Sequence, residues 1–149
     1  FDAPDSDETL GTFENKLLWH YPVGQKNSVF ALLAGGLANR DNVPLPQQYK
    51  LGGLFRLGAY GFDEFSGPNY LLGSLGILKS LTNSPTGPNL YLGLWVEYGG
   101  VYNQLSELNL KNDFSVGLIS PTFLGPLFIC ASCTENFDTV YYMGLGHFF

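Results

Sequence analysis

The chain has 149 residues, of which 45% are hydrophobic and only 13% are charged, whereas soluble domains usually carry about 25% charged residues. The length suits one domain rather than two. A net charge of −6 argues against a nucleic-acid partner, which needs clustered Lys and Arg. No run of about 18 apolar residues is present, so the sequence contains no candidate transmembrane helix. These observations leave a single domain with an unusually large uncharged surface.

The first 11 residues (1–11) are acidic and contain Pro4, so we expect a solvated tail followed by one domain over residues 12–149. Within that domain, apolar residues alternate with polar or small ones, in segments separated by Pro, Gly and Asn, which favour turns. The alternation predicts eight strands, at residues 12–21, 28–37, 49–60, 70–79, 90–100, 113–120, 127–134 and 138–149. The sequence therefore predicts an all-β, antiparallel fold.

The last predicted strand, residues 138–149, is the most informative segment. It ends on an aromatic residue and carries large apolar side chains at alternate positions, interrupted only at His147; they are Tyr141, Met143, Leu145 and Phe149. In an outer-membrane barrel the apolar face of such a strand meets lipid, and the small or polar face meets the lumen. We therefore predict an eight-stranded, antiparallel transmembrane β-barrel in a bacterial outer membrane.

An even number of strands places both ends of the sheet on the same side of the membrane. If the C-terminus is periplasmic, the breaks at 21–27, 61–68, 101–112 and 135–138 face outward and the alternate breaks face the periplasm.

A set of short motifs in residues 49–149 carries a family resemblance. They are Leu51-Gly52-Gly53, Leu57, Tyr60, Glu64, Gly67 and Tyr70, then Leu90 to Gly93 with Glu97 and Gly99, then Leu124 to Leu127, and finally Tyr141, Gly144, Gly146 and Phe149. In this order and spacing they resemble the surface-antigen barrel superfamily. Within it, the chain is most similar to the C-terminal barrel of bacterial patatin-like phospholipases, the patatin-type autotransporters.

The resemblance implies a sixteen-stranded barrel, of which the eight predicted strands would form the second half. The chain would then close on itself as a small barrel, join a second copy or another chain, or belong to a longer protein. The resemblance also implies a conserved-type outer loop with Tyr60, Glu64, Gly67 and Tyr70. The final strand, with Tyr141, Met143, Leu145 and Phe149, would be the signal that the barrel-assembly machinery recognises.

Two departures from the family bear on function. Protein-translocating members carry an Arg-Gly pair before the loop aromatic, where this chain has Gly58-Ala59, which argues against a translocating role. The Gly-x-Ser-x-Gly and Asp-Gly motifs of the patatin lipase do not occur, so no lipase dyad can be assigned and we expect no enzymatic activity from this chain.

The charged residues predicted to face the lumen are Glu14, Lys16, His20, Lys50, Arg56 and Glu97. They would either pair and pack the lumen or line a pore or ligand site, because unpaired buried charges are costly. An ion pair between Arg56 and Glu97 across the lumen is one hypothesis. Cys130 and Cys133 lie three apart on a strand and so point to opposite faces. We expect no cofactor and no metal.

The predicted function is a non-enzymatic outer-membrane anchor that, in a longer parent protein, holds or displays a patatin-like passenger domain. The alternatives are a pore-forming barrel and a soluble, lipocalin-like binder, in which Leu92, Leu94, Phe114 and Leu145 would line the cavity. The loop with Asp63 is expected either to fold back on the lumen or a partner, or to stay solvated. The expected partners are outer-membrane lipid, the barrel-assembly machinery and a possible second barrel chain.

Overall fold

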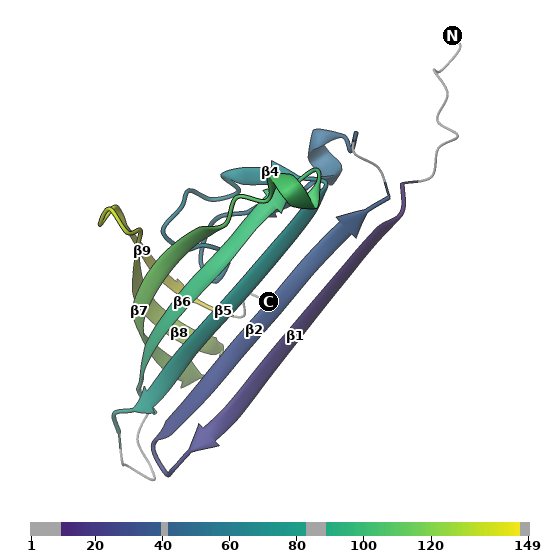
Figure 1. The fold of residues 1–149 in the computed structure, drawn as a ribbon. Helices are drawn as coiled ribbons and strands as arrows, with labels where there is room; N and C mark the ends of the chain where they lie inside the picture. The colour runs from purple at the N-terminus through teal and green to yellow at the C-terminus, as the bar shows by residue number, and fades with distance from the viewer. Residues whose placement is uncertain (1–9, 40–41, 83–88, 147–149) are drawn as a thin grey trace.

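The computed structural model describes residues 10–39, 42–82 and 89–146. Its strands are β1 (Thr12–Val23), β2 (Asn27–Ala38), β3 (Tyr49–Leu51), β4 (Phe65–Gly67), β5 (Asn69–Ser80), β6 (Tyr91–Tyr102), β7 (Lys111–Thr122), β8 (Gly125–Cys133) and β9 (Thr139–Leu145). Short 3-10 helices η1 (Leu45–Gln47) and η2 (Leu105–Glu107) lie in two of the connections. Figure 1 shows the long strands lying side by side in one sheet. No helix among the described residues is long and apolar enough to cross a membrane.

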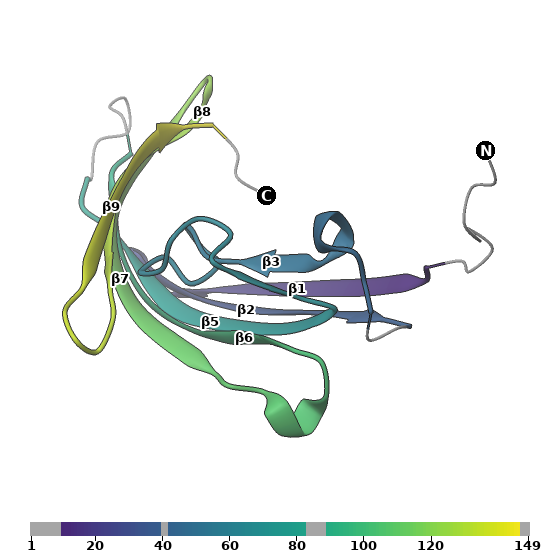
Figure 2. The ribbon, with the colours of Figure 1, turned by 90° about the horizontal axis from the view of Figure 1, so that it is seen from above.

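The main sheet has seven strands in the order β1-β2-β5-β6-β7-β8-β9, and each neighbouring pair is antiparallel. The all-β, antiparallel prediction is therefore confirmed. Seen from above, the sheet is strongly curved, with a long loop inside the curve (Figure 2). Among the described residues β1 and β9 form the two edges of the sheet and do not pair with each other, so the sheet is open.

The prediction of eight membrane-length strands is wrong for residues 49–60. Only Tyr49–Leu51 forms a strand there, and it pairs with β4 outside the main sheet. Phe55 and Leu57 adopt positive φ angles of 59° and 70°, which no β-strand accommodates. The alternation of apolar residues in this segment thus arises from a folded loop.

This change reverses two predicted loop positions. With seven strands, the chain enters the sheet at one end and leaves it at the other. Thr12, the first residue of β1, pairs with Ala38 at one end, whereas Leu145, the last residue of β9, pairs with Leu127 at the other end. The turn at 24–26 therefore shares an end with the connection after β5 and with the end of β9. The prediction that 21–27 lies with the outward breaks is therefore wrong. The prediction that the next break, at 39–48, lies with the periplasmic breaks is wrong too, because β2 ends and β5 begins at the opposite end of the sheet. Both errors arise because the third predicted strand, on which the count relied, is absent from the main sheet.

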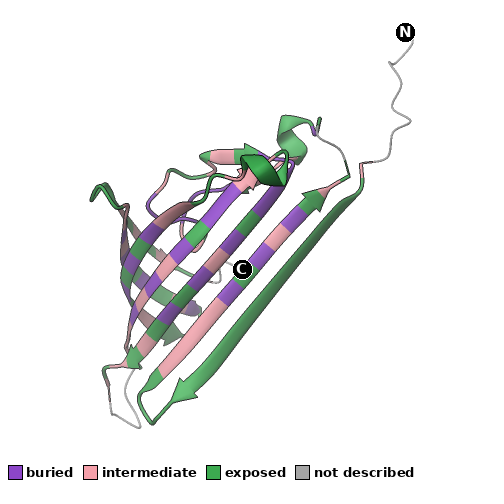
Figure 3. Cartoon of the chain, in the orientation of Figure 1, coloured by how far each residue is buried: buried purple, intermediate pink, exposed green. Residues whose placement is uncertain are grey.

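The two faces of the sheet differ in burial, and buried residues alternate with exposed ones along the central strands (Figure 3). Register pairs share a face, so the face of each residue can be followed across all seven strands. The convex face carries exposed, large apolar side chains on every strand, which include Phe13, Trp19, Tyr21, Leu33, Leu71, Leu75, Ile77, Phe114, Leu118, Ile129, Tyr141 and Met143. The concave face holds the buried polar residues Glu97, Asp113, Ser115 and Ser132.

The hydrophobic core lies on the concave side, between the sheet and the loop. One cluster joins Leu32 and Leu72 of the sheet to Leu51 and Leu57, both of which are fully buried. A second cluster gathers around Trp95 and includes loop and sheet side chains. The core is therefore made by folding the connection between β2 and β5 back onto the sheet.

Candidate functional site

The connection between β2 and β5 forms a compact inner loop, defined here as residues 52–64. At its base, β3 and β4 pair with each other. Within the loop, Gly52 N–H donates to Arg56 O at 2.7 Å and Arg56 N–H donates to Gly53 O at 2.9 Å. Gly61 N–H donates to Glu64 Oε2 at 2.5 Å. These bonds give the inner loop a defined shape of its own.

The inner loop depends on unusual backbone angles. Gly52 has φ of +116°, and a Cβ there would lie 2.1 Å from Gly61 O, so only glycine fits. Phe55 and Leu57 also have positive φ, which costs a non-glycine residue about 1–2 kcal/mol. Full burial of a Leu side chain contributes about 1.5–3 kcal/mol, so the burial of Leu57 offsets the strain at this residue.

Three hydrogen bonds fasten the tip of the inner loop to three different strands; we call these bonds the latch. Gly58 N–H donates to Glu97 Oε2 on β6 at 3.1 Å, and Ala59 N–H donates to Asp113 Oδ2 on β7 at 2.7 Å. From β9, Tyr142 Oη donates to Gly58 O at 2.6 Å. An ordinary protein hydrogen bond contributes about 0.5–1.5 kcal/mol and one to a charged group about 1.5–3 kcal/mol, so the three bonds of the latch together are a substantial part of the loop's anchorage.

Gly58 is required at the latch because the loop approaches β8 closely. A Cβ at this position would lie 2.4 Å from Ser132 Oγ and 3.0 Å from Ser132 Cβ. The Ser132 hydroxyl in turn shares a hydrogen bond of 2.6 Å with Ser115 on β7. Small residues on the strands and a glycine in the loop therefore let the two backbones meet.

Tyr60 extends the attachment beyond the latch. Its hydroxyl donates to Asn112 O at 3.3 Å, at the start of β7. Burial raises the pKa of the Tyr60 hydroxyl, and the nearby charge of Asp113 raises it further. The hydroxyl therefore stays protonated and able to donate at any physiological pH.

A row of polar groups crosses the sheet beneath the latch. Ser74, Glu97 and Asp113 are register neighbours on β5, β6 and β7. Each of the three has a buried side-chain oxygen without a hydrogen bond of ordinary geometry. The indole nitrogen of Trp95, beside them, is also buried without such a bond. Such groups are costly in an apolar environment, so this row marks the polar centre of the concave face.

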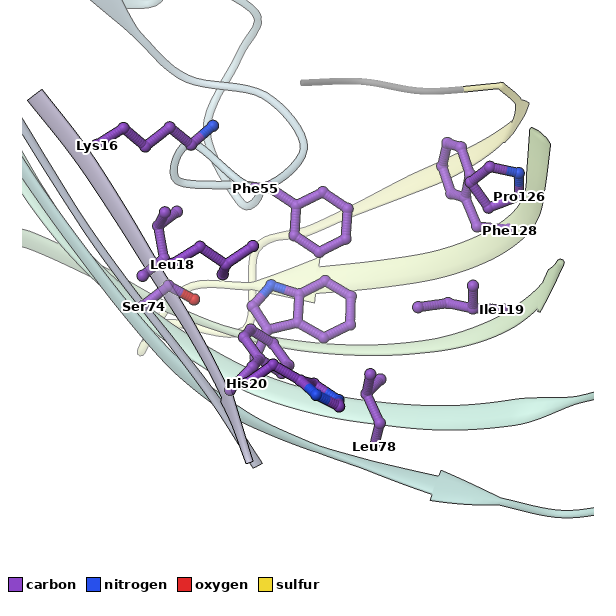
Figure 4. Close-up of a pocket in the computed structure, with 12 residues that line it drawn as sticks. Lys16, Leu18, His20, Phe55, Ser74, Leu78, Ile119, Pro126 and Phe128 are labelled. Atoms are coloured by element: carbon purple, nitrogen blue, oxygen red, sulfur yellow. The ribbon is translucent and has the colours of Figure 1, made fainter. Parts of the chain in front are cut away.

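An apolar cavity of about 580 Å³ lies on the concave face next to the inner loop. Phe55 of the loop stacks on Trp95 at a centroid distance of 5.0 Å and forms part of its wall. Figure 4 shows Leu18, Leu78, Ile119 and Phe128 around the same space, with the polar residues Lys16, His20 and Ser74 on the β1 and β5 side. The cavity is large enough for a small molecule, although its lining is almost entirely apolar.

A comparison with models of known protein families finds none that matches this chain, and a comparison with curated proteins finds no similar sequence. The function must therefore be argued from the geometry. No group of three or more His, Cys, Asp or Glu side chains in residues 10–39, 42–82 and 89–146 could hold a metal ion. The inner loop and the concave face to which it is fastened form the candidate functional site.

The six charged residues predicted to face inward divide into two groups. Glu14, Lys16, His20 and Glu97 lie on the concave face of the sheet by register, and Tyr70 Oη donates to Glu14 Oε1 at 2.5 Å. The other two, Lys50 and Arg56, lie in β3 and the inner loop instead of on a long strand.

The hypothesised ion pair between Arg56 and Glu97 is not formed. Arg56 Nη2 donates to Lys50 O at 2.5 Å, whereas Glu97 accepts from Gly58. The Lys50 ammonium lies 3.5 Å from Asp63. The charges of Arg56 and Asp63 are therefore satisfied by Lys50 of β3, and the inner loop presents backbone N–H groups to the strand carboxyls.

The residues implied by the family resemblance occupy distinct places. Tyr60 and Glu64 lie in the inner loop, Gly67 in β4 and Tyr70 in β5. Of the two alternatives for the predicted outer loop, the structure has the loop folded back on the sheet. The apolar residues of the proposed assembly signal, Tyr141, Met143 and Leu145, are exposed on the convex face, whereas Phe149 and His147 fall outside the described residues.

Sequence reasoning missed three residues of the site. Asp113, Ser132 and Tyr142 all face the loop, yet none was predicted to act there. For Asp113 a signal existed, because it stands in phase with the inward Ser115.

The two cysteines lie on opposite faces of the sheet, as predicted, and both are free thiols. Cys130 is the register neighbour of Tyr142 on the concave face, whereas Cys133 is the register neighbour of Thr139 on the convex face.

Proposed function

We propose that this chain forms part of the wall of a transmembrane β-barrel in a bacterial outer membrane, where it acts as a non-enzymatic anchor. The observation that carries the proposal is the convex face of the main sheet. Large apolar side chains stand exposed on all seven strands of that face, and no described segment covers it. An uncovered apolar surface of this extent is a liability in water and a requirement in lipid.

The lengths of the strands support the same proposal. The five strands β1, β2, β5, β6 and β7 have 12 residues each. At about 3.3 Å per residue, such a strand is about 40 Å long, and a tilt of about 45° brings its height to about 28 Å. The hydrocarbon core of a bilayer is about 30 Å thick, so the sheet matches it.

The inner loop indicates what the barrel does with its interior. The loop lies on the concave side, buries Leu57 against the sheet, and is fastened to three strands by the latch. In a barrel this position is the lumen, so the loop acts as a plug. A plugged lumen favours an anchor over an open pore.

The family resemblance extends the proposal to partners. Barrels of patatin-type autotransporters accompany a passenger domain, and their last strand is recognised by the barrel-assembly machinery. We extend both properties to this chain as part of the proposal, on the motifs around residues 51–70 and 141–149. A lipase activity would belong to a passenger domain, because no dyad stands in this chain.

The soluble, lipocalin-like alternative requires the opposite arrangement of the faces. In that class apolar residues line the interior and charged residues face water. Here Leu92, Leu94, Phe114 and Leu145 lie on the convex face, and Glu97 is fully buried on the concave face. The geometry therefore favours the membrane barrel.

Fractionation of cells that make the protein tests the proposal. The protein is expected in the outer-membrane fraction after a urea wash, and its gel mobility should change when the sample is boiled, as folded barrels unfold only on heating. Recovery in the soluble fraction, without heat-dependent mobility, would contradict the proposal. Leu75→Arg, on the convex face, should lower the amount retained in the outer-membrane fraction in the same assay, whereas Leu105→Arg, in η2, should leave it unchanged.

A further inference from the structure

The main sheet has two unpaired edges, one along β1 and one along β9. Every residue of β1 is exposed, and one side of the strand has no neighbouring strand among the described residues. Backbone N–H and C=O groups along a free edge cannot be left unpaired in hydrocarbon. Under the proposed function, on which this inference rests, both edges must be covered by further strands.

The directions of the strands restrict what can cover these edges. All six strand pairs in the sheet are antiparallel and the number of strands is odd. Therefore β1 and β9 run in the same direction, toward the end of the sheet that holds the turn at 24–26.

Closure within the seven described strands would join β1 and β9 in parallel, and bacterial barrels are antiparallel with about eight strands as the minimum. A second copy inserted in the same orientation would also pair its β9 with β1 in parallel. Antiparallel β1–β1 pairing between two copies requires one of them to be inverted in the membrane. None of these arrangements suits a barrel inserted from one side.

We infer that a further segment of the same polypeptide, preceding β1, closes the barrel with an odd number of strands. Its last strand would pair with β1 and its first strand with β9, and both pairings would be antiparallel. The order of the sheet supports a segment of the same polypeptide, since every neighbouring pair in it joins long strands that are consecutive along the chain. The same up-and-down order, continued before Thr12, places the preceding strand against β1.

The register also predicts which side chains the strand paired with β1 must carry on each of its faces. Residues opposite Phe13, Trp19 and Tyr21 must share the convex, lipid-facing side and therefore be apolar. Residues opposite Glu14 and His20 face the concave side and must be small or polar. The partner of β1 is thus an alternating strand of about 9–11 residues, sufficient to cross the hydrocarbon core.

Photo-cross-linking of the protein in its native membranes tests this inference. A benzophenone amino acid replaces Phe13 or Tyr21, which are 64% and 69% exposed near opposite ends of the β1 edge. The outer membrane is first isolated by fractionation, and this step tests the proposed function separately. The adducts are then mapped by mass spectrometry. The same substitution at Leu33, on the interior strand β2, is the control and should give adducts only with β1 and β5.

The expected adducts lie in the same polypeptide before residue 12, and the site reached from Tyr21 should precede the site reached from Phe13, because the pairing is antiparallel. Adducts in residues 139–145 would overturn the inference, as would adducts to β1 of a second copy or to a separate polypeptide. An absence of protein adducts from both edge positions, with the Leu33 control working, would overturn it as well. A membrane-fraction protein with any of these results would leave the proposed function standing.

Discussion

The two faces of one sheet have opposite surroundings. Along β5, Leu71, Leu75 and Ile77 point outward and stay exposed, whereas their neighbours Leu72 and Ser74 point inward and are buried. The strand is the same, and only the alternation of side chains separates the two environments. The polar groups are inside and the bare apolar groups are outside, which is the reverse of a water-soluble sheet.

The difference teaches that this sheet is built for two neighbours of different kinds. The concave face has a specific partner, the inner loop, which fits its small residues and hydrogen-bonds to its carboxyls. The convex face carries exposed apolar side chains that no described segment covers, as contact with lipid would require. Each of the following substitutions tests one side of this comparison.

The largest effect is expected for a charge on the convex face. Leu75→Arg should destabilise the membrane-inserted protein by about 2–4 kcal/mol, the cost of Arg near the midplane of a barrel's lipid face. Leu75 is 61% exposed and Leu105, in η2, is 71% exposed, so Leu105→Arg is a matched control that should change stability little. Unfolding by urea in lipid vesicles measures both. Equal, small effects at the two positions would mean that the convex face meets water.

The next effect concerns the close approach of the loop to β8. Gly58→Ala places a Cβ 2.4 Å from Ser132 Oγ, and overpacking of this kind costs about 1–3 kcal/mol. The inner loop should loosen, and trypsin should cleave after Arg56 at least several-fold faster. Ser132→Ala in the same chain removes the clashing hydroxyl and should restore part of the protection. Unchanged cleavage in Gly58→Ala would show that the loop is not held against β8.

Two variants of Asp113 separate the contribution of its hydrogen bond to the latch from the contribution of its charge. Asp113→Ala leaves the Ala59 N–H without an acceptor, at a cost of about 1–3 kcal/mol. Asp113→Asn keeps an acceptor oxygen and should lose less. Trypsin cleavage after Arg56 should therefore rank Ala above Asn above the parent chain, and equal rates for Ala and Asn would mean that charge, not the bond, holds the loop.

The smallest effect is expected from the side of β9. Tyr142→Phe removes the hydroxyl that donates to Gly58 O and keeps the ring, so the cost should be about 0.5–1.5 kcal/mol. The matched control is Tyr141→Phe, whose ring lies on the convex face, 79% exposed. Only Tyr142→Phe should increase cleavage of the inner loop. A similar increase in both variants would place the cause in β9 as a whole.

The alternation of the sequence was sufficient to predict the long strands. Residues 90–100 alternate cleanly and match β6, and residues 70–79 match β5 although both of their faces are apolar. The pattern failed at 49–60, where Leu51, Leu57 and Ala59 alternate with other residues as in a strand. Period-2 spacing does not reveal positive φ angles, and the glycines at 52, 53 and 58 were a signal of a turn that the alternation outweighed.

The site was less predictable than the sheet. Glu97 was identified as an inward residue from its strand, but its partner is a backbone N–H of Gly58, which carries no side-chain signal. Arg56 is the expected partner by charge alone, yet its guanidinium donates to Lys50 O of β3. Contacts between a folded loop and distant strands depend on tertiary geometry, which short-range patterns do not contain.

Spin labels along β1 test the central claim most directly, since every residue of this strand is exposed. In a variant with Cys130 and Cys133 replaced by Ala, labels at positions 13 to 21 are measured in the membrane for collision with oxygen, which dissolves in lipid, and with a water-soluble nickel complex. Positions 13, 15, 17, 19 and 21 should favour oxygen, and the even positions between them should not. The opposite phase, or access of the nickel complex to Phe13, Leu17 and Trp19, would contradict a lipid-facing convex surface.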